Sequence, residues 1–266
     1  MSFHTLESAP DLERRFGGLE RLYGTSAYRR LRTLRVAVVG LGGVGSWSVE
    51  ALARSGVAEL VLIDFDHVSE SNINRQIQAL SSTLGQAKGL ALAQRIADIH
   101  PRCEVQVVDD FATPENWPAV LPRPVDVVID ACDQVSAKTA LAAWSVQERM
   151  PFVTVGAAGG KQSPERVESL DLAHVTHDPL LAAVRQRLRK HHGAAKAGDM
   201  GVRCVFSRES VRAPAGVEVS EGLACDSPPS AAPASGLHCA GYGSSVMVTA
   251  TFGMTAAAQA IGLVLS

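Results

Sequence analysis

The chain has 266 residues, of which 46% are hydrophobic and 20% are charged. These values are typical of a globular protein with a real core, built as one large α/β domain or as one domain with an appendage. The formal net charge of −2 gives no general electrostatic case for binding nucleic acid, so any such case requires a local basic patch.

The N-terminal part, residues 1–34, predicts a charged helical arm, with breaks at Gly17-Gly18 and at Gly24. Residues 35–160 alternate short apolar runs with helical patterns. The strands are expected at 36–39, 60–63, 105–108, 125–129 and 152–155, and the helices at 44–55, 84–99 and 136–149. This alternation predicts a Rossmann-like, doubly wound and mainly parallel sheet in the α/β class, with helices on both faces.

Residues 161–266 are predicted to be a C-terminal extension of the same domain. The expected elements are a basic helix over 179–192, a strand over 202–207, a mobile Pro/Ala/Ser loop over 225–235 and an uncharged helix from about residue 244. The stretch from Tyr242 to Ser266 contains several Ser, Thr and Gly residues and is followed by no Lys or Arg. We therefore interpret it as a helix buried in the core or at a dimer interface rather than as a membrane span.

The five cysteines indicate a reducing compartment. They are odd in number, and no two of them have C-x-x-C spacing, which argues against a four-cysteine zinc site. The opening residues show no apolar run of the signal-peptide type. We expect a cytoplasmic protein.

A glycine-rich turn follows the first predicted strand. It has the sequence GLGGVG and contains Gly40, Gly42, Gly43 and Gly45. The second predicted strand ends directly before Asp64. A strand, a glycine turn, a helix and an acidic residue in this order predict a nucleotide site. In such a site the phosphates lie at the helix N-terminus and the carboxylate binds the ribose.

The residues after Asp64 indicate which nucleotide chemistry is involved. Asp66 completes a D-x-D pair, and Asn72, Arg75 and Lys88 follow within N-x-N-R-Q and GQAK. A hydride-transfer enzyme does not need Arg and Lys beyond its pyrophosphate turn, whereas attack on an α-phosphate does, because several negative charges develop there. Solvated helix charges are the competing interpretation of Arg75 and Lys88.

Asp133 follows another predicted strand, in the sequence IDACDQ. A carboxylate at the carboxyl end of a buried strand is well placed to hold Mg²⁺ beside phosphates. The alternative is that Asp133 caps the helix predicted from Ser136.

Together these motifs resemble the adenylating enzymes that activate ubiquitin and its bacterial relatives, such as MoeB, ThiF and HesA. The resemblance spans roughly residues 15–160. It implies that Gly40 to Gly45 hold the phosphates and that Asp64 binds the ribose. It further implies that Asn72, Arg75 and Lys88 contact the triphosphate of ATP and that Asp133 binds Mg²⁺.

Within that superfamily the chain most resembles the tRNA threonylcarbamoyladenosine dehydratases. The motifs that carry this resemblance are RFGG and RLYG, NRQIQAL, VVDDFATP, DPLLAAVRQRLRK, CVFS and MVTATFG. This family uses ATP to cyclise the threonylcarbamoyl group of an adenosine beside the tRNA anticodon. The alternative, shared by the wider superfamily, is adenylation of the C-terminus of a ubiquitin-like sulfur carrier, as in MoeB and ThiF.

The resemblance also implies partners. We expect a homodimer, in which an N-terminal arginine reaches the ATP of the partner subunit. RFGG lacks the second arginine of the R-x-x-R found in MoeB-like enzymes, so both Arg15 and Arg21 are candidates for this role. A monovalent cation at the site and a sulfur-acceptor partner from a cysteine-desulfurase system are further candidates. Cys239 is a candidate acyl or persulfide carrier, although a small core residue is the simpler interpretation.

The basic helix is the candidate surface for tRNA. Its positive residues, together with one that follows it, are Arg185, Arg187, Arg189, Lys190 and Lys196. A solvated helix face is the competing interpretation. Because no aromatic residue is interleaved with these charges, we expect the helix to contact phosphates and to position the tRNA rather than to read bases.

Overall fold

The computed structural model describes residues 10–211 and 242–266. Its centre is a seven-stranded sheet with the strand order β3-β2-β1-β4-β5-β7-β6, in which only β6 is antiparallel to its neighbour. The strands are β1 (Arg35–Val39), β2 (Glu59–Ile63), β3 (Glu104–Val108), β4 (Val127–Asp130), β5 (Phe152–Val155), β6 (Val167–Asp171) and β7 (Arg203–Ser207). The predicted doubly wound, mainly parallel sheet is confirmed.

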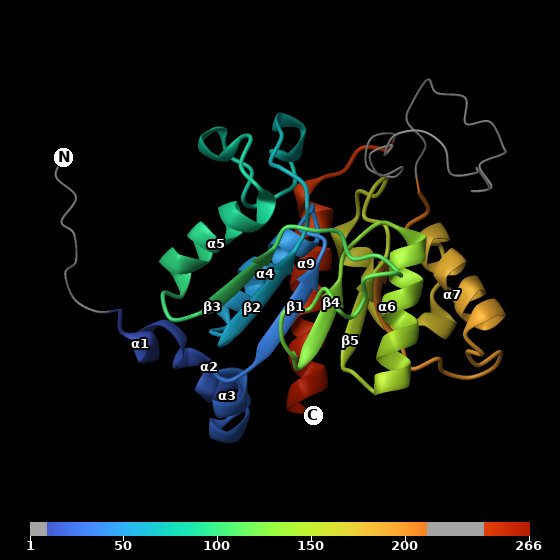
Figure 1. Cartoon of the computed structure of the whole chain (residues 1–266), viewed down its shortest axis with the longest axis horizontal. Coiled ribbons are helices and arrows are strands. Elements are labelled where there is room, and N and C mark those ends of the chain that lie inside the picture. Colours follow the sequence, from blue (N-terminus) through green and yellow to red (C-terminus); the bar gives the residue numbers. More distant parts are fainter. Residues whose placement is uncertain (1–9, 212–241) are drawn as a thin grey trace.

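The sheet is buried on both faces because its strands carry apolar side chains at successive positions. In β1, Val36 and Val38 point into one core layer, and Ala37 and Val39 point into the other. The first layer is covered by α4 (Gly45–Arg54), α5 (Lys88–Ile99) and α9 (Val246–Leu265), and the second by α6 (Val135–Glu148) and α7 (Pro179–His191). Figure 1 shows the sheet between α9 on one side and α6 on the other. Burial on both faces explains the continuous apolar runs in the sequence.

The helix α9 is long and apolar enough to cross a membrane, by length and composition alone. In the fold its inner stripe, which includes Val248, Phe252 and Ala256, is buried in the first core layer. Gly253 lies so close to α4 that a Cβ there would be 2.5 Å from the Val44 carbonyl oxygen. The helix is therefore integral to the globular core, as its sequence predicted.

Two features differ from the sequence-based prediction. The helix expected from Leu84 begins only at Lys88, because Gly85 has a φ of 80° and Ala87 forms a β-bridge with His67. The strand β6 was not predicted. It is the antiparallel edge strand, and its five residues, all of them partly buried, are too few and too polar to stand out from the sequence.

The N-terminal arm consists of three short helices, α1 (Leu12–Phe16), α2 (Gly18–Tyr23) and α3 (Thr25–Leu31). Its position is set by a buried aromatic contact in which the rings of Phe16 and His100 lie 4.7 Å apart. Arg15 donates to the carbonyls of Asp98 and Ile99 at the end of α5, at 3.0 and 2.7 Å. The guanidinium of Arg32 lies 3.1 Å from Nε2 of His100.

Burial, reinforced by the guanidinium groups of Arg32 and Arg15, lowers the pKa of His100 from 6.5 to about 4. The folded chain therefore keeps this imidazole neutral between these two pH values, whereas the unfolded chain binds a proton there. The stability contributed by neutral His100 is complete above pH 6.5 and is lost as the pH falls towards 4.

We predict that His100→Gln makes the free energy of unfolding less dependent on pH between 6.5 and 4. The slope should become shallower by up to about 1.4 kcal/mol per pH unit, the contribution of one proton. Urea unfolding at several pH values measures it, with the exposed His67→Gln as the matched control. Equal slopes for wild type and His100→Gln would contradict the assignment.

Candidate active site

A cavity opens at the carboxyl ends of β1, β2 and β4. At this point the strand order reverses: the chain runs outward from β1 to β2 and β3 and then returns to β4 on the other side of β1. Ligands of open α/β sheets bind at such a switch point. The cavity measures about 270 Å³. It is lined by all but one of the predicted nucleotide-binding residues, namely Gly40, Gly42, Gly43, Asp64, Asp66, Asn72, Arg75, Lys88 and Asp133.

The glycine turn connects β1 to α4, and its glycines have different structural tasks. Gly40 has a φ of 84°, and a Cβ there would lie 2.8 Å from the backbone of Ala131. Gly45, the exception in the lining, lies behind the turn, where a Cβ would be 1.8 Å from the Gly40 carbonyl oxygen. Gly43 packs against Thr249 of α9. A Cβ on Gly42 would meet no atom within 4 Å, so Gly42 leaves open space where a phosphate can approach the backbone.

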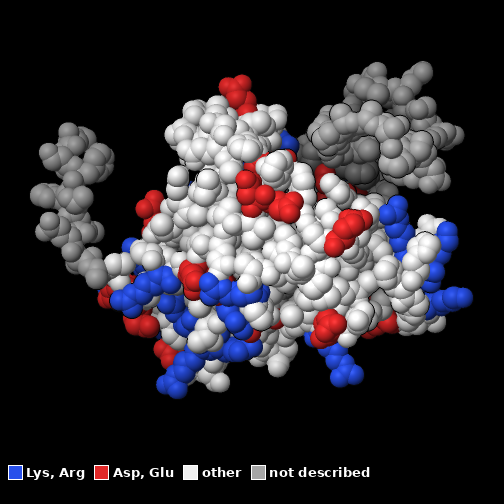
Figure 2. Space-filling view, viewed as in Figure 1, with Lys and Arg blue, Asp and Glu red and all other residues white. Residues whose placement is uncertain are grey.

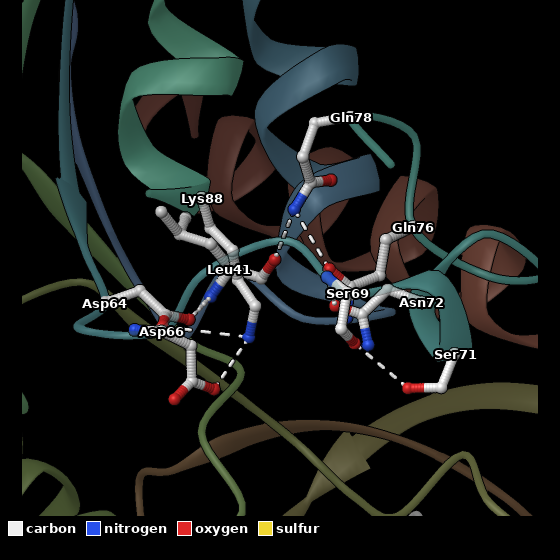
Figure 3. A network of polar contacts seen from close by, with 9 residues as sticks. All are labelled: Leu41, Asp64, Asp66, Ser69, Ser71, Asn72, Gln76, Gln78 and Lys88. Atoms are coloured by element: carbon white, nitrogen blue, oxygen red, sulfur yellow. Dashed lines mark hydrogen bonds and ion pairs between the residues drawn. The ribbon is translucent and has the colours of Figure 1, made fainter. Parts of the chain in front are cut away.

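Asp64 connects β2 to the glycine turn. One carboxylate oxygen accepts from the Leu41 amide at 2.6 Å, and the other accepts from the Asp66 amide at 2.8 Å. Lys88, at the start of α5, lies 3.8 Å from Asp64 and 2.7 Å from Asp66 (Figure 3). Burial raises the pKa of Asp64 above its usual value, although Lys88 and the two amides oppose that shift. Each oxygen keeps a lone pair that can accept a ribose hydroxyl.

The segment between β2 and α5 closes over the turn and is held by amide side chains (Figure 3). Gln78 donates to the Leu41 carbonyl and to Oε1 of Gln76, both at 3.0 Å. Oδ1 of Asn72 accepts from the Ser69 amide at 3.1 Å. Asn72 is buried at the cavity wall, so its carboxamide is fixed there before any ligand binds.

The backbone of Arg75 is fixed more firmly than its side chain. Its carbonyl accepts from Nε1 of Trp47 at 3.0 Å and from the Thr249 hydroxyl at 3.2 Å. Its guanidinium is turned back onto its own segment, where it donates to the Ser71 carbonyl and to Oδ1 of Asn74. Both acceptors are neutral, and a triphosphate is the stronger partner for a guanidinium.

Asp133 is exposed and lines the cavity after the end of β4. The residue at the N-cap of α6 is Gln134, and no side chain caps that helix, so the alternative that Asp133 is a helix cap is wrong. Within the described ranges 10–211 and 242–266, the carboxylate of Asp133 has no hydrogen-bond or ion-pair partner. A free carboxylate beside a glycine turn suits a phosphate-bound Mg²⁺, which typically uses one or two carboxylates from the protein.

A buried charge network beneath this loop was missed by the sequence analysis. Asp130 and Lys138 are both 0% exposed, and their charged atoms lie 3.0 Å apart. The Thr154 hydroxyl donates to Asp130 at 2.7 Å, and the Cys132 amide donates to it at 3.2 Å. Burial alone would lower the pKa of Lys138, but Asp130 outweighs it and the pKa is raised. The available signal was a carboxylate inside an apolar run, which requires a buried counter-charge.

The two candidate N-terminal arginines do not line this cavity. Arg15 is bound to the end of α5, as described above, and Arg21 is exposed on α2. The arm lies by the amino end of the sheet, away from the glycine turn (Figure 1). Neither arginine therefore acts on the cavity of its own chain from these positions.

The predicted basic helix is confirmed as α7. Some of its positively charged side chains bind backbone carbonyls, and others are exposed to solvent. Arg185 donates to the carbonyls of Leu172 and Val175 at 3.1 and 2.7 Å, and Arg189 donates to the Ala195 carbonyl at 3.1 Å. Lys190 and Lys196 are exposed beside them, and Arg187 is exposed on another side of the helix. Figure 2 shows blue side chains gathered at this edge of the molecule.

The described cysteines are not activated thiols. Burial raises the pKa of Cys103 to about 12 and raises those of Cys132 and Cys204 well above the usual value. Cys239 and the predicted loop 225–235 lie outside the described residues.

A family model described as "ThiF family" matches residues 18–266. The chain belongs to the ThiF family. Its relatives include the tRNA threonylcarbamoyladenosine dehydratase of Escherichia coli (strain K12), at 44% identity over 93% of this chain and 92% of the relative. The enzyme of the same name from Haemophilus influenzae is 39% identical over 98% of this chain and 97% of its own length. The predicted resemblance to this group of the ThiF family is confirmed.

Solved structures agree with the sequence comparison. The chain is similar to the E. coli dehydratase TcdA in complex with ATP, with a TM-score of 0.80 and 41% identity over 94% of this chain and 93% of that one. The complex of the same enzyme with AMP gives a TM-score of 0.81 at the same identity and coverage. Nearly the whole chain of this ThiF protein therefore has the fold of an enzyme that binds adenine nucleotides.

Two glycines of the turn are needed for different reasons, Gly45 for the fold and Gly42 for ligand binding. We predict that Gly45→Ala destabilises the fold by about 2 kcal/mol or more, because its Cβ would overlap the Gly40 carbonyl. Gly42→Ala should keep wild-type stability, because its Cβ would meet no protein atom, but should weaken ATP binding by filling the phosphate space. Urea unfolding and calorimetric ATP titration measure the two effects. A Gly42→Ala protein with unchanged ATP affinity would place the phosphates elsewhere.

Proposed function

We propose that this ThiF protein is an ATP-dependent tRNA threonylcarbamoyladenosine dehydratase that works through an acyl-adenylate. The observation that carries the proposal is the end-to-end similarity to dehydratases of that name, together with a cavity that gathers the expected nucleotide-binding residues. The competing reaction, adenylation of a ubiquitin-like sulfur carrier, would use the same nucleotide site. The relatives that match this chain nearly end to end are, however, named as dehydratases.

The residues of the cavity suit attack of a carboxylate on an α-phosphate. The glycine turn and the N-terminus of α4 receive the phosphates, and Asp64 accepts the ribose hydroxyls. Arg75 and Lys88 offset the charge that develops on the transferring and leaving phosphates. The threonyl carboxylate forms the bond to the α-phosphorus and pyrophosphate leaves. The adjacent carbamoyl group then attacks the activated acyl carbon, and AMP leaves with the oxygen that is lost as water.

Asp133 is the residue that we assign to Mg²⁺. It is exposed at the cavity and free of partners within the described segments, and bound Mg²⁺ would supply charge neutralisation for the phosphates. The buried pair of Asp130 and Lys138 supports the loop that carries Asp133. A monovalent cation and a sulfur-acceptor partner stay predictions, as does a cytoplasmic location.

The proposed reaction is tested by incubating the protein with ATP, Mg²⁺ and tRNA that carries threonylcarbamoyladenosine, followed by mass spectrometry of the nucleoside. We predict an ATP-dependent loss of one water from the nucleoside. Asp133→Asn, which keeps size but removes the charge, should reduce turnover at least about 100-fold without changing the unfolding midpoint. An unchanged nucleoside, with pyrophosphate exchange on addition of a ubiquitin-like protein that ends in Gly-Gly, would favour the sulfur-carrier reaction.

We further propose that α7 and the segment after it contact tRNA phosphates. Lys190 and Lys196 are exposed beside one another along the same groove, without ion-pair partners in the described part of the chain. Arg185 is assigned to structure instead, because it binds two backbone carbonyls.

We predict that a double variant carrying Lys190→Gln and Lys196→Gln binds tRNA more weakly, and that its tRNA affinity depends less steeply on salt. The slope of log K against log salt should fall by about one unit for each lysine that no longer binds a phosphate. Arg185→Gln, the matched control, should instead lower the unfolding midpoint. Binding titrations across a salt series measure the slope, and an unchanged slope places the phosphate contacts on another surface.

A homodimer is the assembly that we propose for this chain. The outer stripe of α9 is uncharged, and Met247 and Met254 on it are 61% and 41% exposed. An uncharged apolar stripe at the surface suits an isologous interface. Arg21 does not line the cavity of its own chain. In a homodimer it would have the cavity of the partner subunit within reach. Sedimentation equilibrium of the whole chain decides between monomer and dimer.

A further inference from the structure

A second groove, of about 500 Å³, lies between α6 and α7 on the face of the sheet opposite α9. Helix α6 contributes Ser136, Trp144 and Gln147 to its lining, and α7 contributes Arg187 and His191. The segment that follows β3 contributes Trp117. Its volume is in the range of sites that bind small molecules or single nucleotides.

Aromatic rings form part of the groove. Trp117 and Trp144 pack edge to face, with ring centroids 5.2 Å apart and planes at 89°. Trp117 is 8% exposed and belongs to the core, whereas Trp144 is only partly buried and presents surface to the groove. Nε1 of Trp117 is buried and makes no hydrogen bond to any described residue. Stacking on an accessible indole face is a sequence-tolerant way of holding a nucleobase.

The charge of the groove suits a phosphodiester. Arg187 is exposed, and no carboxylate of residues 10–211 or 242–266 forms an ion pair with it. None of the residues that line the groove is acidic, although the whole chain has a net charge of −2. Ser136 and Gln147 add neutral donors and acceptors for base edges. An acidic peptide would use the arginine but would leave the indole surface without a stacking partner.

The groove and the nucleotide cavity are lined by residues of the same structural elements. In the first turn of α6 and the loop before it, Asp133, Gln134 and Ala137 line the nucleotide cavity, while Ser136 and Thr139 line the groove. In the segment after β3, Phe111 and Ala112 line the cavity, while Pro114 and Trp117 line the groove. A strand of RNA whose modified adenosine reaches the cavity can therefore place a neighbouring nucleotide in the groove.

We propose that the groove between α6 and α7 binds an unpaired nucleotide of the tRNA substrate, with the base stacked on Trp144 and the phosphate bound by Arg187. This inference rests on the proposed tRNA substrate and adds the place where the single-stranded part of that RNA is recognised. Lys190 and Lys196, in a separate groove lined by α7 and the segment after it, remain the contacts for a paired stem.

The test compares two RNA probes on the full-length protein: an anticodon stem–loop, and the same stem as a duplex without the loop. Trp144→Ala should weaken binding of the stem–loop about tenfold, the effect of losing one stacked base, and leave duplex binding and ATP binding unchanged. Trp144→Phe is the matched control that keeps a ring, and it should restore most of the affinity. Arg187→Gln should weaken stem–loop binding and make its salt dependence shallower.

Wild-type affinity for the stem–loop in both Trp144→Ala and Arg187→Gln would overturn the proposal. If Trp144→Ala also loses ATP binding because the core is disturbed, the surface variant Arg187→Gln decides alone. Quenching of tryptophan fluorescence by a polyglutamate peptide and not by RNA would also overturn it.

The groove and the proposed function can fail separately. If Trp144→Ala weakens stem–loop binding but the wild-type protein dehydrates no tRNA, the proposed function is refuted and the groove stands. If the wild-type protein dehydrates tRNA and Trp144→Ala keeps both activity and normal RNA affinity, the function stands and the groove is refuted.

Discussion

The nucleotide site depends on how the backbone of Leu41 is held. Its amide donates to Asp64 at the end of β2, and its carbonyl accepts from Gln78 of the segment that closes over the turn. These two bonds tie the glycine turn to two other parts of the chain before any ligand binds. Because the turn is fixed in this way, the open space at Gly42 faces the cavity without reorganisation, which is what electrostatic stabilisation of a phosphate transition state requires.

A second constraint acts on the opposite wall of the same cavity. The buried pair of Asp130 and Lys138 lies below the loop that carries Asp133, and Asp130 also binds the Cys132 amide. Replacing a buried ion pair by apolar residues often leaves stability unchanged or improved, so stability does not explain its presence. Its geometric effect is to fix the end of β4 and hence the position of the exposed carboxylate. The buried ion pair thus helps to position the exposed carboxylate of Asp133.

The proposed nucleotide site does not by itself define the substrate. The glycine turn, Asp64 and Lys88 are the residues that we propose for ATP binding, and nothing in their geometry selects the carboxylate to be activated. We therefore assign substrate selection to surfaces around the site, namely α7 and the groove between α6 and α7. The nucleotide cavity and the groove are lined by neighbouring residues of α6 and of the loop before it.

The sequence by itself determined the sheet, the glycine turn and most of the polar residues that line the cavity, because strand, turn and helix signals are local and the motifs follow one another along the chain. It did not predict the edge strand β6, the partner of Asp130 or the structural role of Arg185, since each depends on a contact between distant segments. It also indicated no aromatic residue near the basic helix. Folding brings Trp117 and Trp144 beside Arg187, because packing α6 against α7 joins residues that no spacing along the chain connects.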